Sequence, residues 1–338
     1  ASLASGTAMA QRVVALSTLA PAAGVRVDGL ADGDLLGINS DAIGDFNGDG
    51  LDDVLISAEE AQQGRGSTYV VFGRSGGFAA GVSLDQLNGS NGFRLDGAPY
   101  DGFNHRARGA GDVNGDGHDD LIIGLSSSND FDGRACIVYG QAAMDAIATI
   151  DTLPSGQITC MHGSQRYENV GKSVAALGDF NGDGLGDVAI GTVHGDFAGA
   201  ESGSVYVIYG RAPNLGTHIA LAALDGTQGF RIDGGAADDR FGISVGSGDV
   251  NGDGLADLIA GAERAGGQGA AYVLFGSAHR QDTPMSVTML DGPRGFAIRT
   301  ETPHAFLGRA VGSADVNRDG YDDVLVGSLQ NRAYVVNG

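Results

Sequence analysis

The residues of this sequence with the clearest chemistry are aspartates that recur in a nine-residue motif. The first copy, DFNGDGLDD, spans residues 45–53, and related copies follow at 112–120, 179–187, 249–257 and 315–323. Their first aspartates lie 67, 67, 70 and 66 residues apart. A near-constant period of this size indicates a repeat architecture rather than two ordinary domains.

Each copy, written D-x-N-x-D-G-x-x-D, has the donor pattern of a metal-binding loop. Side-chain oxygens fall at positions one, three, five and nine, and a backbone carbonyl at position seven can complete the set. Hard oxygen donors without sulfur or imidazole favour Ca²⁺. We therefore predict about five Ca²⁺ ions. The predicted ligands are Asp45, Asn47, Asp49, Leu51 and Asp53; Asp112, Asn114, Asp116, His118 and Asp120; Asp179, Asn181, Asp183, Leu185 and Asp187; Asp249, Asn251, Asp253, Leu255 and Asp257; and Asp315, Asn317, Asp319, Tyr321 and Asp323.

The motif is only partly an EF-hand loop. Its first six positions match, but position twelve, where an EF-hand has glutamate, is apolar in every copy. The ninth-position aspartate must then close the site, and strands rather than helices must flank it. At position seven only the carbonyl would bind, so we expect the side chains of His118 and Tyr321 to face solvent. The alternative is a simple hairpin turn at NGDG, which five complete copies disfavour.

Composition restricts the partners. The formal net charge is -22, and 15 of the acidic residues occupy positions one, five and nine of the motifs. A nucleic-acid partner is disfavoured because no basic stripe is present to neutralise phosphates. No apolar run approaches 18 residues, so we expect no membrane span. Residues 1–11 are interpreted as a tail, without the charged region and apolar core of a signal peptide.

One repeat contains four predicted strands. In the fourth copy, residues 229–234 (strand D) and 241–249 (strand A) precede the acidic loop, and 257–262 (strand B) and 270–276 (strand C) follow it. All are short, bounded by glycine, and either alternating or continuously apolar. The repeat has no helical pattern.

Four-stranded units repeated radially form a β-propeller. The chain begins with a D-type strand at 25–29 and ends with a C-type strand at 333–338, so the two ends could complete one blade. We therefore expect an all-β fold over residues 12–338: a five-bladed β-propeller of four-stranded antiparallel blades, whose last blade joins the N-terminal D-type strand to the C-terminal A, B and C strands. The rival geometries are an open solenoid and a fragment of a seven-bladed ring.

The repeat resembles the FG-GAP repeat of the integrin α-subunit propeller and its bacterial relatives. The FG element is Phe241-Gly242, with weaker forms at residues 36–37, 170–171 and 307–308, whereas repeat two has Phe103-Asn104. The proline of the GAP element is missing throughout. The resemblance implies Ca²⁺ in the acidic loops, an extracellular or periplasmic location, and ligand binding on the opposite face. Integrin propellers have seven blades, so their ligand chemistry is not transferred to this chain.

The two cysteines fall at matching positions of neighbouring strands. Cys136 occupies the strand C position that is Tyr in the other repeats, and Cys160 occupies the strand D position that is Arg in three others. Tyr and Arg there could form a cation–π pair. Both positions of the second blade become cysteine together, so we predict a Cys136–Cys160 disulfide, which fits an oxidising compartment. The alternative is two buried thiols.

The loops away from the acidic motifs are the predicted ligand face, because binding is usually hosted on variable loops. Aromatic side chains beside amides and carboxylates there could bind a sugar. The candidates are Glu59, Glu60, Arg65, Asn129, Asp130, Phe131, Asp132, His194, Asp196, Phe197, Glu201, Glu263 and Arg264 in the B–C loops, and Tyr100, Asp101, Arg166, Tyr167, Glu168, Asp238, Asp239, Arg240, His304 and Phe306 in the D–A loops.

The functional hypothesis is a secreted or cell-surface, calcium-binding adhesion or recognition module with an extracellular protein or glycan as its partner. The alternative is a carbohydrate-active enzyme, a lyase or glycosidase, on the same loops, although no known catalytic motif occurs. A third reading is a spacer within a larger surface protein.

Overall fold

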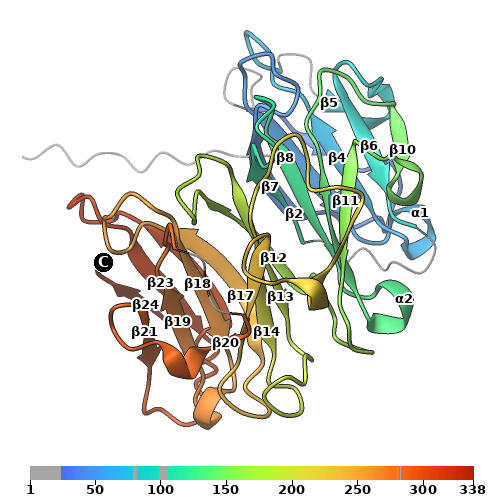
Figure 1. Cartoon of the computed structure of the whole chain (residues 1–338). Helices are drawn as coiled ribbons and strands as arrows, with labels where there is room; N and C mark the ends of the chain where they lie inside the picture. The colour runs from blue at the N-terminus through green and yellow to red at the C-terminus, as the bar shows by residue number, and fades with distance from the viewer. Residues whose placement is uncertain (1–23, 79–81, 99–105, 280, 282) are drawn as a thin grey trace, which may run out of the picture.

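The computed structural model describes residues 24–338 except 79–81, 99–105, 280 and 282. These residues form consecutive β-sheets that follow one another along an arc (Figure 1). The predicted tail, the predicted start of the domain at residue 12 and the Phe103-Asn104 element lie outside the described residues.

Blades 1 to 4 have the predicted strand order A, B, C, D, with antiparallel neighbours, and the described strands of blade 5 are A, B and C. Blade 1 is β2 (Leu36–Gly44), β3 (Asp53–Ala58), β4 (Ser67–Val71) and β6 (Gly92–Asp96); blade 2 is β7 (Arg106–Gly111), β8 (Asp120–Leu125), β9 (Arg134–Val138) and β11 (Ile158–His162); blade 3 is β12 (Ser173–Gly178), β13 (Asp187–Thr192), β14 (Ser204–Ile208) and β16 (Gly229–Asp233); blade 4 is β17 (Phe241–Gly248), β18 (Asp257–Ala262), β19 (Ala270–Leu274) and β21 (Gly295–Arg299); blade 5 has β22 (Ala310–Ala314), β23 (Asp323–Ser328) and β24 (Arg332–Val336).

The remaining elements are short. One-turn helices α1 (Ala61–Gly64) and α2 (Ser128–Phe131) lie in B–C loops, and 3-10 turns occur at Leu84–Gln86, Ile150–Thr152, Leu221–Ala223, Ala265–Gly267 and Val287–Met289. None of the helices in the described part of the chain is long and apolar enough to cross a membrane.

Three blades carry a fifth, parallel strand that was not predicted. β10 (Ile147–Thr149) comes from the C–D connection of blade 2 but pairs with β6 of blade 1. β15 (His218–Ala220) and β20 (Met285–Ser286) do the same for β11 and β16. Each covers a D-strand edge that would otherwise be exposed. These segments have two or three residues, too few for a periodic pattern to show in the sequence.

The two ends of the arc are open among the described residues. β1 (Val27–Asp28) pairs only with β5 (Val82–Ser83), in the same parallel way that β6 pairs with β10. This identifies β1 as a D-type strand, as predicted. β24 pairs only with β23, so the predicted pairing of β1 with β24 is not observed. Apolar side chains at both ends are exposed; examples are Leu35, Ile38, Leu329 and Val335.

The hydrophobic core lies between blades rather than in one centre. Phe46, Phe72 and Phe93 of blade 1 stack with ring centroids 5.4–6.3 Å apart and pack against residues such as Leu121 of blade 2. Separate clusters join blades 2 and 3, 3 and 4, and 4 and 5. Each blade therefore depends on its neighbours for burial of its apolar faces.

Glycine is required where consecutive blades touch. Gly308 has φ +83°, and its carbonyl oxygen lies 1.9 Å from where a Cβ on Gly261 would be. The pairs Gly171–Gly124 and Gly242–Gly191 repeat this approach between earlier blades. The glycine of the FG element thus packs backbone to backbone on strand B of the preceding blade, which only glycine allows.

Candidate functional site: the acidic loops and the opposite face

The acidic loops all lie at the same end of their blades, which we call the acidic end, and they are joined in series. The position-eight N–H of each loop donates to the position-one carbonyl of the preceding loop in all four contacts; examples are Asp119 to Asp45 at 3.0 Å and Asp322 to Asp249 at 2.8 Å. Where position eight is Asp, its carboxylate also accepts the N–H of position one, at 2.7 and 3.0 Å. The five loops therefore form one continuous acidic rim.

Positions one, three and five of each loop direct their oxygens toward the interior of the turn. In the fourth loop, Asp249 accepts the N–H groups of Asp253 and Gly254, at 3.1 and 3.0 Å. Asn251 accepts the Asp253 N–H at 2.9 Å, and Asp253 accepts that of Leu255 at 2.9 Å. The other loops repeat this pattern, so the five motifs share one local conformation.

The ninth aspartate of each loop is fully buried. It accepts the N–H of the glycine that ends strand C: Gly73, Gly140, Gly210 and Gly276 at 2.8 Å, and Gly338 at 3.2 Å. In loops two to five its other oxygen accepts the N–H of position two, at 2.8–3.0 Å. This residue therefore ties the loop to strand C, a structural role that the sequence analysis missed. The glycine recurring after every strand C was the available signal.

Burial raises the pKa of this carboxyl group in loops one to four. The pKa of Asp120 and of Asp187 rises to about 7, and that of Asp53 and of Asp257 to about 6. The nearby carboxylates of the same loop raise it further, whereas the backbone N–H groups lower it. A cation in the loop would favour the ionised form.

The oxygen donors of the loops are suited to a hard cation, and one buried oxygen atom gives direct support for such an ion. Oδ2 of Asp53 is buried without a hydrogen-bond partner, which is costly unless something else satisfies it. Among the described residues, however, no three His, Cys, Asp or Glu side chains converge closely enough to hold an ion in this conformation. The 25 ligand positions therefore remain a prediction.

Position seven has a role between blades. His118 is half-buried rather than solvent-facing as expected, because its ring packs against Gly48 of the preceding loop. Tyr321 is 42% exposed and packs in the same way against Gly252. Position four is glycine in four loops and Arg318 in the last. The structure describes no following loop that would pack against Arg318.

The predicted disulfide is confirmed. Cys136 and Cys160 are cross-strand partners, with an S–S distance of 2.08 Å. Tyr69 and Arg94 occupy the same register in blade 1, as predicted, but Arg94 forms an ion pair with Asp96 at 2.9 Å. In blade 3, the Arg231 guanidinium lies 3.5 Å from the ring centroid of Phe197 rather than over its cross-strand partner Tyr206. The predicted cation–π pairs are therefore not formed at these two positions.

At the end of the blades opposite the acidic loops, several of the candidate loop residues line one cavity. It has a volume of about 500 Å³, between blades 2 and 3, and is lined by Phe131, Arg166, Tyr167, Asn169, His194, Asp196 and Glu201. Phe131 and Tyr167 are 55% and 52% exposed. The Arg166 guanidinium lies 4.9 Å from the Tyr167 ring centroid, and His194 lies 3.5 Å from Glu201. Exposed aromatics beside carboxylates and an amide thus meet here.

Other loop candidates are structural. Glu168 is buried; it accepts the Tyr206 hydroxyl at 2.6 Å and two loop N–H groups. Asp239 is buried and accepts two N–H groups of its own loop. Glu263 is buried and pairs with Arg309 at 2.5 Å. Tyr100 and Asp101, and the side chains of Asn129 and Asp130, lie outside the described residues.

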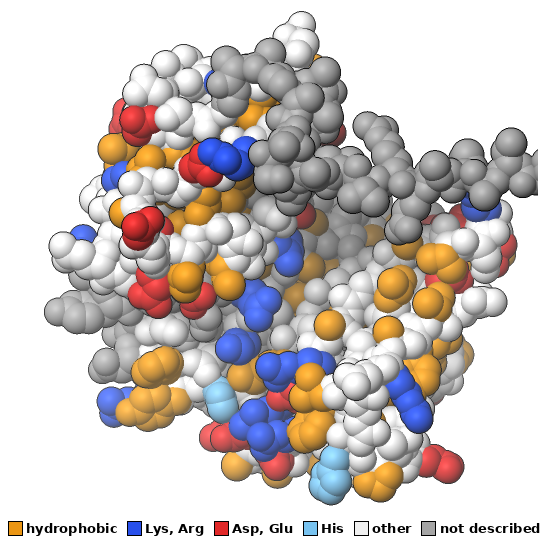
Figure 2. All heavy atoms as spheres, turned by 180° about the vertical axis from the view of Figure 1, so that it is seen from behind, with side chains coloured by type: hydrophobic (Ala, Val, Ile, Leu, Met, Phe, Trp, Pro, Cys, Tyr) orange, Lys and Arg blue, Asp and Glu red, His pale blue; other side chains and the backbone are white. Residues whose placement is uncertain are grey.

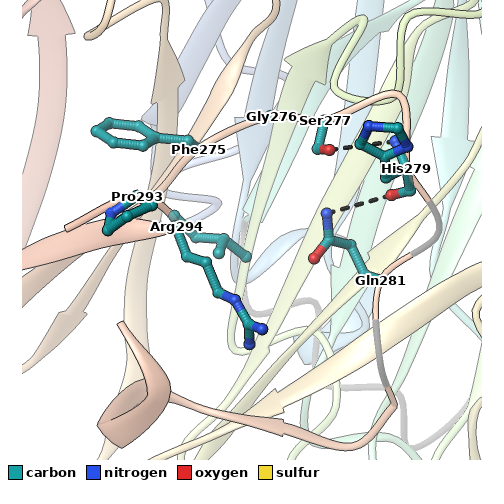
Figure 3. Close-up of a pocket in the computed structure, with 8 residues that line it drawn as sticks. Phe275, Gly276, Ser277, His279, Gln281, Pro293 and Arg294 are labelled. Carbon is teal, nitrogen blue, oxygen red and sulfur yellow. Dashed lines mark hydrogen bonds between the residues drawn. The ribbon is translucent and has the colours of Figure 1, made fainter. Parts of the chain in front are cut away.

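A smaller cavity of about 260 Å³ lies at the acidic end, on the C–D connection of blade 4, and was not predicted (Figure 3). Its polar groups contact one another: Ser277 accepts the His279 N–H at 3.1 Å, and Gln281 donates to the His279 carbonyl at 3.3 Å. Figure 3 shows Arg294 extending alongside this loop. The hydrogen bonds stabilise the loop itself, so we assign no ligand to this cavity.

The structural and ligand roles of the aspartates can be separated by mutation. Asp257→Asn places an amide NH₂ against one of the two N–H donors of Gly276 and Val250, so we expect a loss of about 2 kcal/mol in unfolding free energy even without metal. Asp253→Asn is the matched control because Asp253 is exposed and the amide oxygen of the substituted side chain can still accept the Leu255 N–H. Urea unfolding in EDTA measures both. Equal effects would contradict the assignment.

Comparison with known proteins agrees with this architecture. The FG-GAP repeat model matches residues 38–71, 170–208, 241–274 and 307–336. The chain is 29% identical to chicken (Gallus gallus) integrin alpha-V over 225 residues, which is 65% of this chain and 19% of that protein. It is 29% identical to integrin alpha pat-2 of Caenorhabditis elegans over 245 residues, 70% of this chain and 18% of that protein.

A second group of relatives is enzymatic by name. The bovine (Bos taurus) phosphatidylinositol-glycan-specific phospholipase D is 32% identical over 171 residues, 48% of this chain and 19% of that protein. The chain spans about a fifth of the length of each of these relatives. The chain therefore carries FG-GAP repeats and is distantly similar to integrin α subunits and to this phospholipase.

Proposed function

We propose that this chain is an extracellular, calcium-stabilised recognition module of the adhesion type. The supporting observation is that the two ends of the blades differ: five acidic loops that share one motif lie at one end, and an open cavity with exposed aromatic side chains lies at the other. The Cys136–Cys160 disulfide is typical of an oxidising compartment. The integrins among the relatives favour the adhesion class.

The calcium ions would be held by positions one, three, five and nine and by the position-seven carbonyl of each loop. Their chemistry would be structural: a divalent cation neutralises carboxylates that otherwise repel one another. Because the loops are linked in series, an ion in one loop also stabilises the contact with the next blade. Binding to the folded state alone adds stability by mass action.

Calcium removal is the first test of this proposal. We expect EDTA to lower the melting temperature and added Ca²⁺ to restore it saturably, with about five ions per chain by native mass spectrometry. Mg²⁺ is the matched control, because it is smaller and favours octahedral water-rich coordination. An unchanged melting temperature and no bound metal would show that the motifs are only turns.

The ligand would bind the cavity between blades 2 and 3. Phe131 and Tyr167 could stack on a sugar ring or an aromatic side chain, while Asn169 and Asp196 could hydrogen-bond to it. Aromatic anchors of this kind dominate binding energy.

Substitution of the two aromatics tests the ligand face. Phe131→Ala combined with Tyr167→Ala should weaken binding to an immobilised glycan or matrix protein at least about tenfold, without changing calcium stabilisation. Tyr321→Ala, at the acidic end, is the matched control. Arrays of extracellular glycans and proteins, probed in Ca²⁺, supply the measurement. A ligand that binds the double variant as well as the unmodified chain would refute this location.

We further propose that the ring closes by pairing β1 with β24. Three observations support this: β1 has the contacts of a D-type strand, β24 has a free edge among the described residues, and both ends of the arc expose apolar side chains. Arg318, in place of the glycine of the other loops, favours the open-solenoid alternative, because any following loop would have to pack its position-seven side chain against this arginine.

An engineered disulfide decides between these geometries. Arg26 and Tyr334 occupy the repeat positions of Cys160 and Cys136, so Arg26→Cys with Tyr334→Cys should form an intramolecular bond in a closed ring. Tyr69→Cys with Arg94→Cys is the positive control, because those residues are cross-strand partners. Intact mass and non-reducing gels provide the readout. Free thiols in the first variant would show that the ends stay apart, and disulfide-linked dimers would show pairing between copies.

A carbohydrate-active enzyme is the second candidate function. It is favoured by the same cavity, where Tyr167, His194, Asp196 and Glu201 lie together. Tyrosine, histidine and paired carboxylates are the groups that can transfer protons. Release of reducing ends from a bound polysaccharide would favour this function over simple recognition.

A further inference from the structure

The inner surface of the arc carries a cluster of basic side chains, although the chain as a whole is strongly acidic. A cavity of about 190 Å³ lies between the A strands β7, β12, β17 and β22. Arg106, Arg108 and Arg309 line it. Figure 2 shows Lys and Arg side chains gathered along the hollow of the molecule. We call Arg106, Arg108, Arg309 and the neighbouring Lys172 the channel cluster.

The channel cluster lies at the end of the blades opposite the acidic loops. The A strands run toward those loops, and the cluster residues occupy the first positions of β7 or directly precede β12 and β22. Lys172 is the only lysine of the chain. The cluster therefore opens toward the proposed ligand face and away from the carboxylates of the rim.

Two of these residues are not explained by the repeat. Arg106 stands opposite Gly124 in the register where blades 3 to 5 have Ser173, Ser244 or Ala310 and blade 1 has Asn39. Arg108 stands where blades 3 to 5 have Ala175, Gly246 or Gly312 and blade 1 has Asp41. Small side chains suffice for the fold at these positions in blades 3 to 5. The two arginines of blade 2 thus extend into space that the small residues of blades 3 to 5 leave.

The positive charge of the cluster is only partly neutralised. Arg309 pairs with Glu263 at 2.5 Å, and Arg108 donates to the Asn39 amide oxygen and to the Ala107 carbonyl. No carboxylate among the described residues forms an ion pair with Arg106, Arg108 or Lys172.

The cations of the cluster influence one another. Burial lowers the pKa of Lys172, and the charges of Arg106 and Arg309 lower it further. The pKa of Arg106 is lowered by burial and then by Arg108 and Arg309, while Glu59 opposes the shift. Cations gathered in a concave, partly desolvated site attract anions strongly. An anion placed there would relieve their mutual repulsion.

We propose that the channel cluster binds one compact oxyanion group, a carboxylate or a sulfate, carried by a ligand that approaches the face opposite the acidic loops. The volume of the cavity suits a single such group rather than a whole polymer. Arginine is suited to hold it, because its planar fork of N–H donors matches carboxylate and sulfate oxygens. The inference deepens the proposed recognition function, on which it rests, by assigning the ligand an acidic character.

The test uses small probes in excess Ca²⁺ at constant ionic strength, which is adjusted with sodium chloride. Sodium sulfate and sodium glucuronate are titrated calorimetrically, with glucose as the neutral comparison. We expect saturable binding of at least one of the two anions and none of glucose. Binding of sulfate alone, or of glucuronate alone, identifies which group the cluster holds. No saturable binding of either anion, or equal binding of glucose, would overturn the proposal.

Two variants locate the site. Arg106→Gln should weaken anion binding about tenfold, since a charge-assisted hydrogen bond is lost. Arg74→Gln is the matched control, because Arg74 lies on a C–D connection at the acidic end and stacks on Phe78 at 5.3 Å. Lys172→Gln serves as a second variant should Arg106→Gln fail to fold. Unchanged binding in the cluster variants, or equal weakening in the control, would refute this location.

Chemical acetylation of the only lysine gives an independent readout. The bound anion should slow modification of Lys172 in the unmodified chain and not in Arg106→Gln, as measured by mass spectrometry. Retained calcium-dependent stabilisation alongside absent anion binding would reject the anion site and leave the proposed function standing.

Discussion

Five buried carboxylates hold this architecture together. The ninth aspartate of each acidic motif lies between strand B, which it begins, and the glycine that ends strand C, whose N–H it accepts in every blade. In four loops its other oxygen also accepts the N–H of the second residue of the motif. In loops one to four desolvation raises the pKa of this carboxyl group. The backbone donors offset that shift, and a cation would offset it further. This one side chain therefore determines both the shape of the loop and its attachment to the sheet.

Contacts between blades also depend on a few positions that recur in the repeat. In blades 3 to 5 the glycine of the FG element packs on a strand B glycine of the preceding blade. In loops two to five position seven packs on the glycine at position four of the preceding loop. A repeat under these constraints varies little at its contact points. Departures from the pattern then carry information: Arg318 replaces the glycine on which a following loop would pack, and Arg106 and Arg108 mark a surface whose chemistry the fold does not require.

Much of the architecture could be predicted from the sequence. The period, the four strands of blades 1 to 4 and the Cys136–Cys160 pair follow from comparing the repeats with one another, because each repeat controls for the others. The parallel strand β10 could not be predicted, since three residues carry no periodicity. The burial of Glu168 was equally hidden, because its partner Tyr206 lies 38 residues away. The cavity lined by Phe131, Tyr167 and His194 required knowing which loops of neighbouring blades adjoin.

The parallel strands β10, β15 and β20 have a consequence for how such a chain could arise. Each is supplied by one blade but completes the sheet of the blade before it, so the unit that folds is offset from the unit that repeats. Because each parallel strand lies within a C–D connection, a duplicated A–D repeat would carry its own parallel strand, which covers the D strand of the copy before it. The array could therefore grow by whole repeats, and each added repeat would contribute a strand to the sheet of the preceding one.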